Sequence, residues 1–296
     1  MASSTQVKTI TVDNGVEVFY REAVPTSGKD ISSLPVILLL HGFPSSSFQF
    51  RNLIPILATK YRVLAPDLPG YGFTAVPEER RYQYTFESIT NTIAAFLDAL
   101  RIKEFSVYIF DYGAPTALRL ALQRPKAIKA IISQNGNAYE EGLGKDFWAP
   151  VKKAWEDPSK ENFAALEKVT SLPITKWQYE NGSPNRSAIP PETYHLDYYL
   201  MTRSGNAKIQ LDLLMDYRNN VKLYPEFQKY LREFKPPLLA VWGKNDVIFV
   251  PPGAEAFKRD NPNATVKFVD DGHFPLESAV AEIGHDILRF LEKQRI

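Results

Sequence analysis

A carboxylate stands at a predicted strand-to-helix join in the stretch YIFDYGAP, residues 108–115. The aromatic and β-branched run 105–110 predicts a buried strand, and the apolar spacing of 113–124 predicts a helix. Many hydrolases expose a nucleophilic serine at such a join, in the pattern Gly-x-Ser-x-Gly. Here the position holds Asp111, and Gly113 follows two residues later. The sequence therefore predicts an aspartate nucleophile.

Aspartate and serine suit different reactions at this position. A serine hydroxyl loses a proton as it attacks, so it needs a general base at that moment. An aspartate with an ordinary pKa of about 3.9 is already ionised at neutral pH. Its attack on a carboxylic ester would leave an anhydride, whereas its attack on an sp3 carbon would leave an ordinary alkyl ester. Asp111 therefore indicates an alkyl electrophile that is opened by backside displacement.

The elements that must position Asp111 alternate along the chain. Strand-like apolar runs follow helix-like amphipathic stretches, which predicts an α/β protein with a mostly parallel sheet covered by helices on both faces. The predicted strands are 16–20, 35–40, 61–67, 105–110, 130–135, 237–242 and 265–270, and the predicted helices are 48–59, 84–100, 113–124, 252–260 and 276–293.

The alternation stops between residues 137 and 234. This segment has no convincing strand pattern and holds three of the four tryptophans, Trp148, Trp155 and Trp177. We expect a helical cap over 137–234, inserted into a core made of residues 1–136 and 235–296. Because pockets form where domains meet, the aromatic residues of the cap are candidates for a binding wall, with packing inside the cap as the alternative for each.

Four short motifs follow predicted strands, where open α/β sheets place their active sites. They are HGFP, FDYGAP with Asp111, GKND with Asp246, and DGHF with His273. Together with DLPGYGFT, they resemble the α/β-hydrolase fold family, in the branch of epoxide hydrolases and haloalkane dehalogenases that use an aspartate nucleophile. The resemblance covers about residues 15–295, and the chain order nucleophile, acid, histidine fits that fold.

The resemblance implies a role for each of these residues. Asp111 attacks the alkyl carbon, His273 deprotonates the water that hydrolyses the ester, and Asp246 orients the imidazole. The backbone N–H groups of Phe43 and Tyr112 would hold the oxyanion that develops on Asp111. Two alternatives stay open: Asp246 could cap a turn, and the chain could be a catalytically silent ligand-binding or non-hydrolytic protein of the same fold.

The residues around the nucleophile bear on the leaving group. Dehalogenases of the family usually have a tryptophan directly after the nucleophile, and many have an asparagine in HGNP, so that both side chains donate N–H groups to the halide. Tyr112 and Phe43 occupy these positions here, which favours an epoxide. Ile109, however, replaces the glycine typical of epoxide hydrolases and looks more like a dehalogenase. Haloalkane dehalogenation by the same triad is therefore the alternative.

Epoxide hydrolases of the family protonate the leaving oxygen with cap tyrosines. Tyr217 or Tyr224 lies roughly where the family places one of them, and Trp155 stands near the usual position of the other. We therefore expect proton donation by a single tyrosine or by water. Trp148, Trp155 and Trp177 are further candidates for substrate-binding residues.

Charge and motif content limit the partners. Lys and Arg (35) nearly balance Asp and Glu (34), so the chain shows no basic surface for nucleic acid or an anionic membrane. We expect a small, largely uncharged organic substrate, with water as the second reactant. No Gly-x-Gly-x-x-Gly follows an early strand and no His, Asp and Glu cluster suggests a metal site, so no cofactor and no metal is expected.

The cellular compartment is predicted from three features that the sequence lacks: a transmembrane stretch, a secretory signal and cysteine. The longest apolar stretch near the start is about ten residues, against the roughly 20 that a transmembrane helix needs. The first residues lack the pattern of a secretory signal. Cysteine is absent, which permits a reducing compartment. We expect a cytoplasmic protein, and the oligomeric state stays open.

Overall fold

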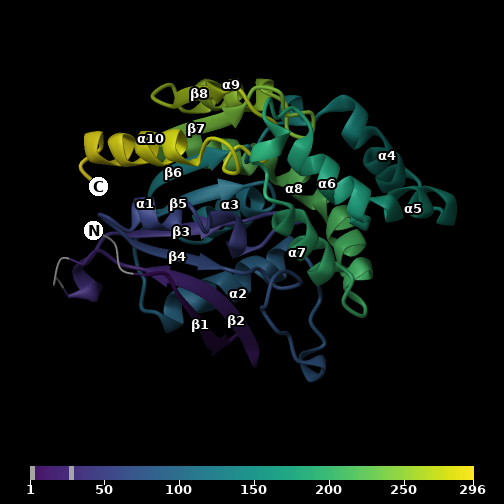
Figure 1. Cartoon of the computed structure of the whole chain (residues 1–296), viewed down its shortest axis with the longest axis horizontal. Helices are drawn as coiled ribbons and strands as arrows, with labels where there is room; N and C mark the ends of the chain where they lie inside the picture. The colour runs from purple at the N-terminus through teal and green to yellow at the C-terminus, as the bar shows by residue number, and fades with distance from the viewer. Residues whose placement is uncertain (1–3, 27–29) are drawn as a thin grey trace.

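The computed structural model describes residues 4–26 and 30–296; residues 1–3 and 27–29 of the predicted core lie outside the described residues. Its centre is an eight-stranded sheet in the order β1-β2-β4-β3-β5-β6-β7-β8. At one edge, β2 pairs antiparallel with both β1 and β4, and all other pairs are parallel (Figure 1). The strands are β1 (Gln6–Val12), β2 (Val16–Ala23), β3 (Val36–Leu40), β4 (Arg62–Pro66), β5 (Phe105–Phe110), β6 (Ile128–Gln134), β7 (Leu238–Gly243) and β8 (Thr265–Val269).

The predicted α/β class and its mostly parallel sheet are confirmed. The seven predicted strands form β2 to β8, with ends that differ by a few residues. The strand β1 was not predicted, because it lies at the sheet edge and most of its residues are exposed. An edge strand that buries little apolar surface gives only a weak apolar pattern in the sequence.

Helices cover both faces of the sheet because its central strands are apolar on both sides. In β3, Leu38 and Leu40 belong to one buried cluster and Ile37 and Leu39 to the other, as the alternation of side chains along a strand requires. The first cluster includes α2 (Phe86–Ala99), α3 (Gly113–Gln123) and α9 (Pro252–Asp260), and the second includes α1 (Ile54–Leu57) and α10 (Val280–Lys293).

Two predicted helices are shorter in the structure. The predicted stretch 48–59 contains a 3-10 turn at Ser47–Phe50 and the single turn α1. The predicted stretch 276–293 becomes helical only at Val280. The predicted helices 84–100, 113–124 and 252–260 form α2, α3 and α9.

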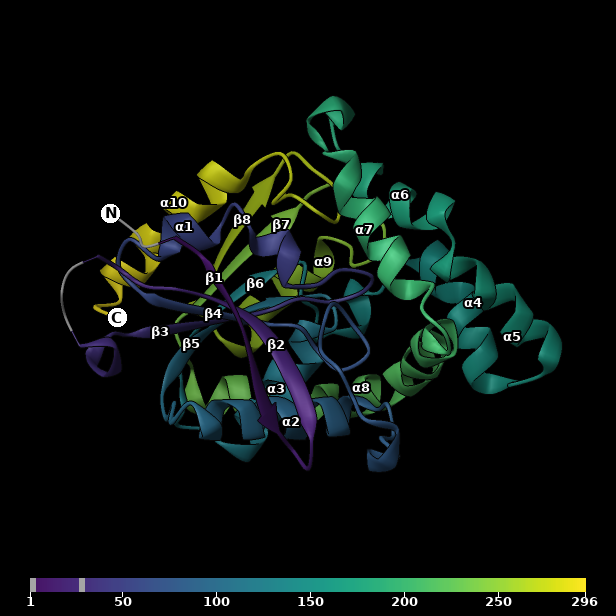
Figure 2. The ribbon, with the colours of Figure 1, turned by 60° about the horizontal axis from the view of Figure 1, so that its bottom comes forward.

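The segment 137–234 is helical. All of its residues are described, and none lies in a strand; its only β contact is the isolated bridge from Leu143 to Phe249. Its helices gather at the end of the sheet toward which the parallel strands point (Figures 1 and 2). They are α4 (Lys145–Glu156), α5 (Lys160–Leu166), α6 (Leu172–Glu180), α7 (Pro191–Met201) and α8 (Asn206–Phe234).

The long helix α8 connects this segment to the rest of the chain. It begins beside α7, and its later turns run along α2 and α3 on one face of the sheet (Figure 2). Because one continuous helix contacts both parts, α8 holds the helical segment in place over the strand ends. The division into a separate cap over 137–234 stays a prediction.

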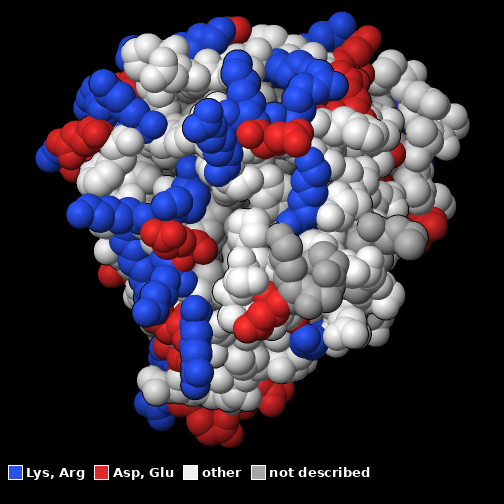
Figure 3. Space-filling view, turned by 90° about the vertical axis from the view of Figure 1, so that its left-hand side faces the viewer, with Lys and Arg blue, Asp and Glu red and all other residues white. Residues whose placement is uncertain are grey.

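The opposite end of the molecule carries charges of both signs. Figure 3 shows this face, with Lys and Arg across its upper part and Asp and Glu among them. Exposed ion pairs in the structure include Lys60 with Glu292 and Lys129 with Glu104. Within residues 4–26 and 30–296, no helix has both the length and the apolar character needed to cross a membrane.

Candidate active site

Asp111 occupies a tight turn between β5 and α3. Its φ is 46°, in the left-handed region that costs a non-glycine residue energy and that is common at functional sites. The turn is possible because Gly113 follows: a Cβ at this position would lie 2.3 Å from the carbonyl oxygen of Leu40 in β3. The glycine noted in the sequence is therefore required by this close approach, and the turn places the Asp111 carboxylate beyond the strand ends.

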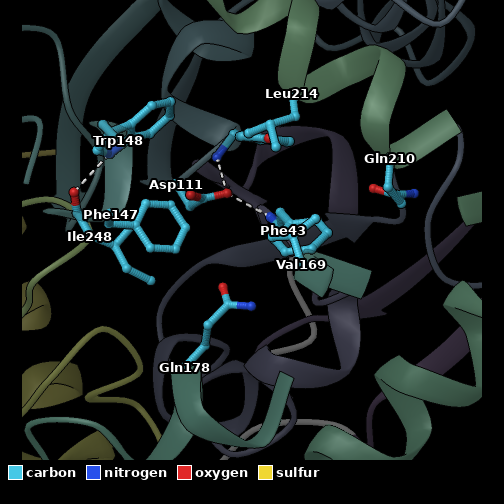
Figure 4. A pocket seen from close by; sticks show the side chains of 10 residues that line it. Phe43, Asp111, Phe147, Trp148, Val169, Gln178, Gln210, Leu214 and Ile248 are labelled. Atoms are coloured by element: carbon cyan, nitrogen blue, oxygen red, sulfur yellow. Dashed lines mark hydrogen bonds between the residues drawn. The ribbon is translucent and has the colours of Figure 1, made fainter. Parts of the chain in front are cut away.

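One oxygen of the Asp111 carboxylate is held by the backbone. Oδ1 accepts hydrogen bonds from the N–H groups of Phe43 and Tyr112, each at 2.6 Å (Figure 4). Gly42 makes this approach possible, because a Cβ there would lie 2.2 Å from Oδ1. The structure thus brings together the residues expected for the oxyanion hole. The other oxygen, Oδ2, lies 3.8 Å from Nε2 of His273.

His273 is oriented by Asp246. The Asp246 carboxylate can only accept, so His273 Nδ1 carries the proton and donates to Oδ2 at 2.7 Å. Asp246 also accepts from the Ile248 N–H at 2.8 Å and from the Asn135 side chain at 2.6 Å. Nε2 of His273 has no hydrogen-bond partner among the described residues. The imidazole therefore presents a free lone pair beside Asp111.

The pKa values of Asp111 and His273 are both raised, but from different causes. Desolvation raises the pKa of Asp111 to about 6, although His273 and the N–H groups of Phe43 and Tyr112 oppose this shift. For His273, burial disfavours the charged form, but the Asp246 and Asp111 carboxylates outweigh it and raise the pKa. At neutral pH the carboxylate is mostly ionised and can act as a nucleophile.

A small cavity lies beside Asp111, which is one of its lining residues. It leaves about 10 Å³ for the centre of a water molecule, which is about the room that one water needs. Apart from Asp111 and Tyr112, its polar lining consists of Gln178 and Gln210 (Figure 4). The complete lining is Phe43, Asp111, Tyr112, Phe147, Trp148, Val169, Gln178, Gln210, Leu214 and Ile248.

The three tryptophans singled out in the sequence differ in position. Trp148 lines the cavity, but its indole N–H donates to the carbonyl of Ile248 at 2.9 Å. The indole N–H of Trp155 donates to the carbonyl of Leu214 at 3.1 Å. Trp177 lines an outer apolar groove of about 300 Å³, which shares Phe147, Val169 and Leu214 with the inner cavity.

The two predicted tyrosine donors pair with each other. The hydroxyl groups of Tyr217 and Tyr224 are 3.0 Å apart, and Asn137 donates to Tyr224 at 3.3 Å. Both side chains are buried, and Tyr217 packs on Trp148 and Tyr112. The described residues that line the cavity do not include either tyrosine. Their role as proton donors stays a prediction.

Sequence reasoning missed Gln178 and Gln210. Glutamine is common on the solvated face of helices, and neither residue lies near a motif, so the sequence carries no signal that they face a cavity. Sequence reasoning also gave no role to Asn135, whose side-chain amide donates to Asp246.

The other histidines are elsewhere. Nε2 of His41 accepts from the Leu68 N–H at 2.9 Å, so its Nδ1–H donates to the carbonyl of Gly42, a structural arrangement of a neutral ring. His285 is exposed on α10. In the part of the chain that the structure describes, no three His, Asp or Glu side chains gather as a metal site would require.

Known proteins resemble this chain in sequence and in fold. Residues 35–280 match a family described as alpha/beta hydrolase fold. A Saccharomyces cerevisiae protein named as an uncharacterized hydrolase is 47% identical over 285 residues, which cover 94% of each chain.

More distantly similar proteins include a haloalkane dehalogenase and an epoxide hydrolase. A haloalkane dehalogenase of Psychrobacter cryohalolentis is 31% identical over 163 residues, which cover 53% of this chain and 52% of that protein. The crystal structure of an epoxide hydrolase of Vigna radiata superposes with a TM-score of 0.71 at 24% identity, over 98% of each chain. The second likeness shows the shared fold.

Proposed function

Since the chain belongs to the α/β-hydrolase fold family and is a hydrolase, we propose that it opens epoxides through an alkyl ester on Asp111. The observation that carries this proposal is the state of the Asp111 carboxylate. Oδ1 is held by two backbone N–H groups, and Oδ2 lies 3.8 Å from Nε2 of His273. This arrangement suits a carboxylate that attacks with Oδ2 and is later attacked at its own carbon.

In the first step, Oδ2 of Asp111 attacks an epoxide carbon. The new O–C bond forms as the ring C–O bond breaks, and the ring oxygen takes a proton from a tyrosine or from water and becomes a hydroxyl. The product is an alkyl ester of Asp111. Because Oδ1 is fixed by the N–H groups of Phe43 and Tyr112, the carboxylate is held in one orientation for the attack.

In the second step, His273 accepts a proton from water, which attacks the ester carbon of Asp111. The oxyanion forms on Oδ1, where the Phe43 and Tyr112 N–H groups already point. Asp246 stabilises the imidazolium through the 2.7 Å bond to Nδ1. Collapse of the oxyanion breaks the bond between the ester carbon and Oδ2, and the departing oxygen takes the proton of the new carboxyl group, which releases the diol and restores the Asp111 carboxylate. In this proposal α4 to α8 act as the cap that excludes bulk water.

The contacts of the aromatic residues support an epoxide over a haloalkane. A departing halide needs N–H donors, but the indole N–H groups of Trp148 and Trp155 are both bonded to backbone carbonyls. The residue after the nucleophile is Tyr112, whose side chain offers no N–H. A haloalkane is therefore the second candidate substrate for the same triad.

The test is to trap the ester. In His273→Gln the base is lost, so a single turnover with a panel of aryl and alkyl epoxides and haloalkanes should leave an adduct visible by intact mass. An epoxide adds its full mass, whereas a haloalkane adds its mass less that of the hydrogen halide. The double variant Asp111→Asn with His273→Gln is the control and should take up nothing. If no compound labels His273→Gln and none is turned over by the parent protein, the proposal is wrong.

A further inference from the structure

Two glutamines face the cavity beside Asp111 from two different helices. Gln178 belongs to α6 and is 2% exposed, and Gln210 belongs to α8 and is 1% exposed. Figure 4 shows both side chains directed toward the space around Asp111. Each carries a polar atom that is buried and has no hydrogen-bond partner among the described residues, Nε2 in Gln178 and Oε1 in Gln210.

The two free atoms have opposite hydrogen-bonding character. Nε2 of Gln210 donates to the carbonyl of Gly70 at 3.0 Å, which fixes the amide so that its oxygen is left as an acceptor. Gln178 lines the cavity and its Nε2 is unpaired, so its amide can present these hydrogens to the cavity as a donor. Buried polar groups in folded proteins are nearly always paired, and an unpaired one destabilises the fold. A donor and an acceptor that are both free in one cavity indicate a ligand with the complementary groups.

We propose, building on the function proposed above, that Gln178 and Gln210 select epoxides that carry a hydroxyl group near the ring. An epoxide oxygen has no hydrogen and can only accept, so it pairs with the Gln178 N–H. A substrate hydroxyl can donate to Oε1 of Gln210. The same pairing disfavours a carboxylate at this position, because a carboxylate would bring a second acceptor to Oε1.

Gln178 stabilises the leaving oxygen without giving up a proton. A carboxamide N–H is too weak an acid to give up its proton, so water supplies the proton to the ring oxygen. The hydroxide left behind is neutralised by the proton that His273 takes from the hydrolytic water. The sum is one epoxide and one water giving one diol.

Tyr217 is the competing donor, and its position makes the two assignments separable. Its hydroxyl is bonded to that of Tyr224, and the described lining of the cavity includes Gln178 but not Tyr217. A Tyr217 donor would need to break this bond and turn into the cavity, whereas Gln178 already lies there.

The test compares two matched epoxides, glycidol and epoxybutane, which differ by a hydroxyl in place of a methyl group. The rate of ester formation on Asp111 is measured in the His273→Gln background. We expect glycidol to react faster by at least about tenfold, because a site with a buried acceptor rejects the analogue that lacks the donor. Gln210→Met should bring the ratio to about one, and Gln178→Met should slow both epoxides by about tenfold or more and keep the ratio.

The control is Gln228→Met, which makes the same substitution on α8, the helix that also carries Gln210. Gln228 donates to the carbonyl of Ala138, and its variant should keep both rates. An unchanged ratio in Gln210→Met overturns the hydroxyl assignment. Full rates in Gln178→Met together with a loss in Tyr217→Phe overturn the donor assignment. If esters form with both epoxides at equal rates in the parent background, the selectivity is wrong and the mechanism stands; if neither epoxide nor any compound of the wider panel forms an ester, the mechanism itself fails.

Discussion

The buried carboxylate of Asp111 should destabilise the protein at neutral pH, and Asp111→Asn should remove this cost. The side chain is 4% exposed, and burial raises its pKa from 3.8 to about 6. Because the pKa in the folded state is higher than in the unfolded state, the folded state binds this proton more tightly. The stability that the group contributes is therefore present at low pH and is lost as the pH rises through about 6.

The magnitude follows from the two pKa values. A difference of about two pKa units at about 1.4 kcal/mol each gives about 3 kcal/mol at pH 7.5, and the same relation gives about half of that at pH 5. The asparagine retains Oδ1 as an acceptor for the Phe43 and Tyr112 N–H groups, so these hydrogen bonds should survive. Asparagine also tolerates the left-handed φ of 46°.

The assay is urea unfolding of the parent and of Asp111→Asn between pH 5 and pH 8. We expect the variant to be the more stable form, with a gap that widens as the pH rises. Asp146→Asn is the control, because Asp146 is exposed in the first turn of α4 and its substitution removes the same charge. A gap that does not change with pH would refute the reasoning that burial of the carboxylate is costly.

Three further predictions concern the same site. Ester formation should fall on acidification with an apparent pKa of about 6, because Asp111 must be ionised. Ester hydrolysis should also fall on acidification, because His273 must be neutral to accept a proton from water; rapid-quench rates across pH measure both steps. Gly42→Ala should abolish ester formation, since its Cβ would lie 2.2 Å from Oδ1 of Asp111, whereas Gly205→Ala, with nothing within 4 Å, should keep activity despite a positive φ of 77°. Gln178→Met should raise the free energy of unfolding by about 1 kcal/mol, because it removes a buried donor that has no partner; an unfolding curve equal to that of the parent would contradict this.

The sequence predicted the sheet and the position of its polar residues for a physical reason. Central parallel strands are buried on both faces, so they appear as continuous apolar runs such as β3 and β5. A polar residue directly after such a run has to lie at the carboxyl edge. Asp111, Asp246 and His273 could therefore be assigned to one edge of the sheet from their spacing, and the structure brings them together there.

The helical segment was predictable only in outline. Its length and aromatic content identified it as helical, but the direction of a side chain on a helix depends on packing that spacing does not reveal. The indole N–H groups of Trp148 and Trp155 point to backbone carbonyls, and Tyr217 pairs with Tyr224. Gln210 faces inward because the Gly70 carbonyl, which is far away in sequence, holds its amide.

The central claim is that Asp111, and not water, attacks the substrate. A single turnover in water enriched in oxygen-18, with the parent protein in excess over an epoxide, tests it most directly. If Asp111 attacks, the diol contains only ordinary oxygen, because its new hydroxyl comes from Oδ2 of Asp111, and the peptide containing Asp111 gains one oxygen-18. A labelled diol with an unlabelled peptide would contradict the account, since water would then have attacked the substrate directly.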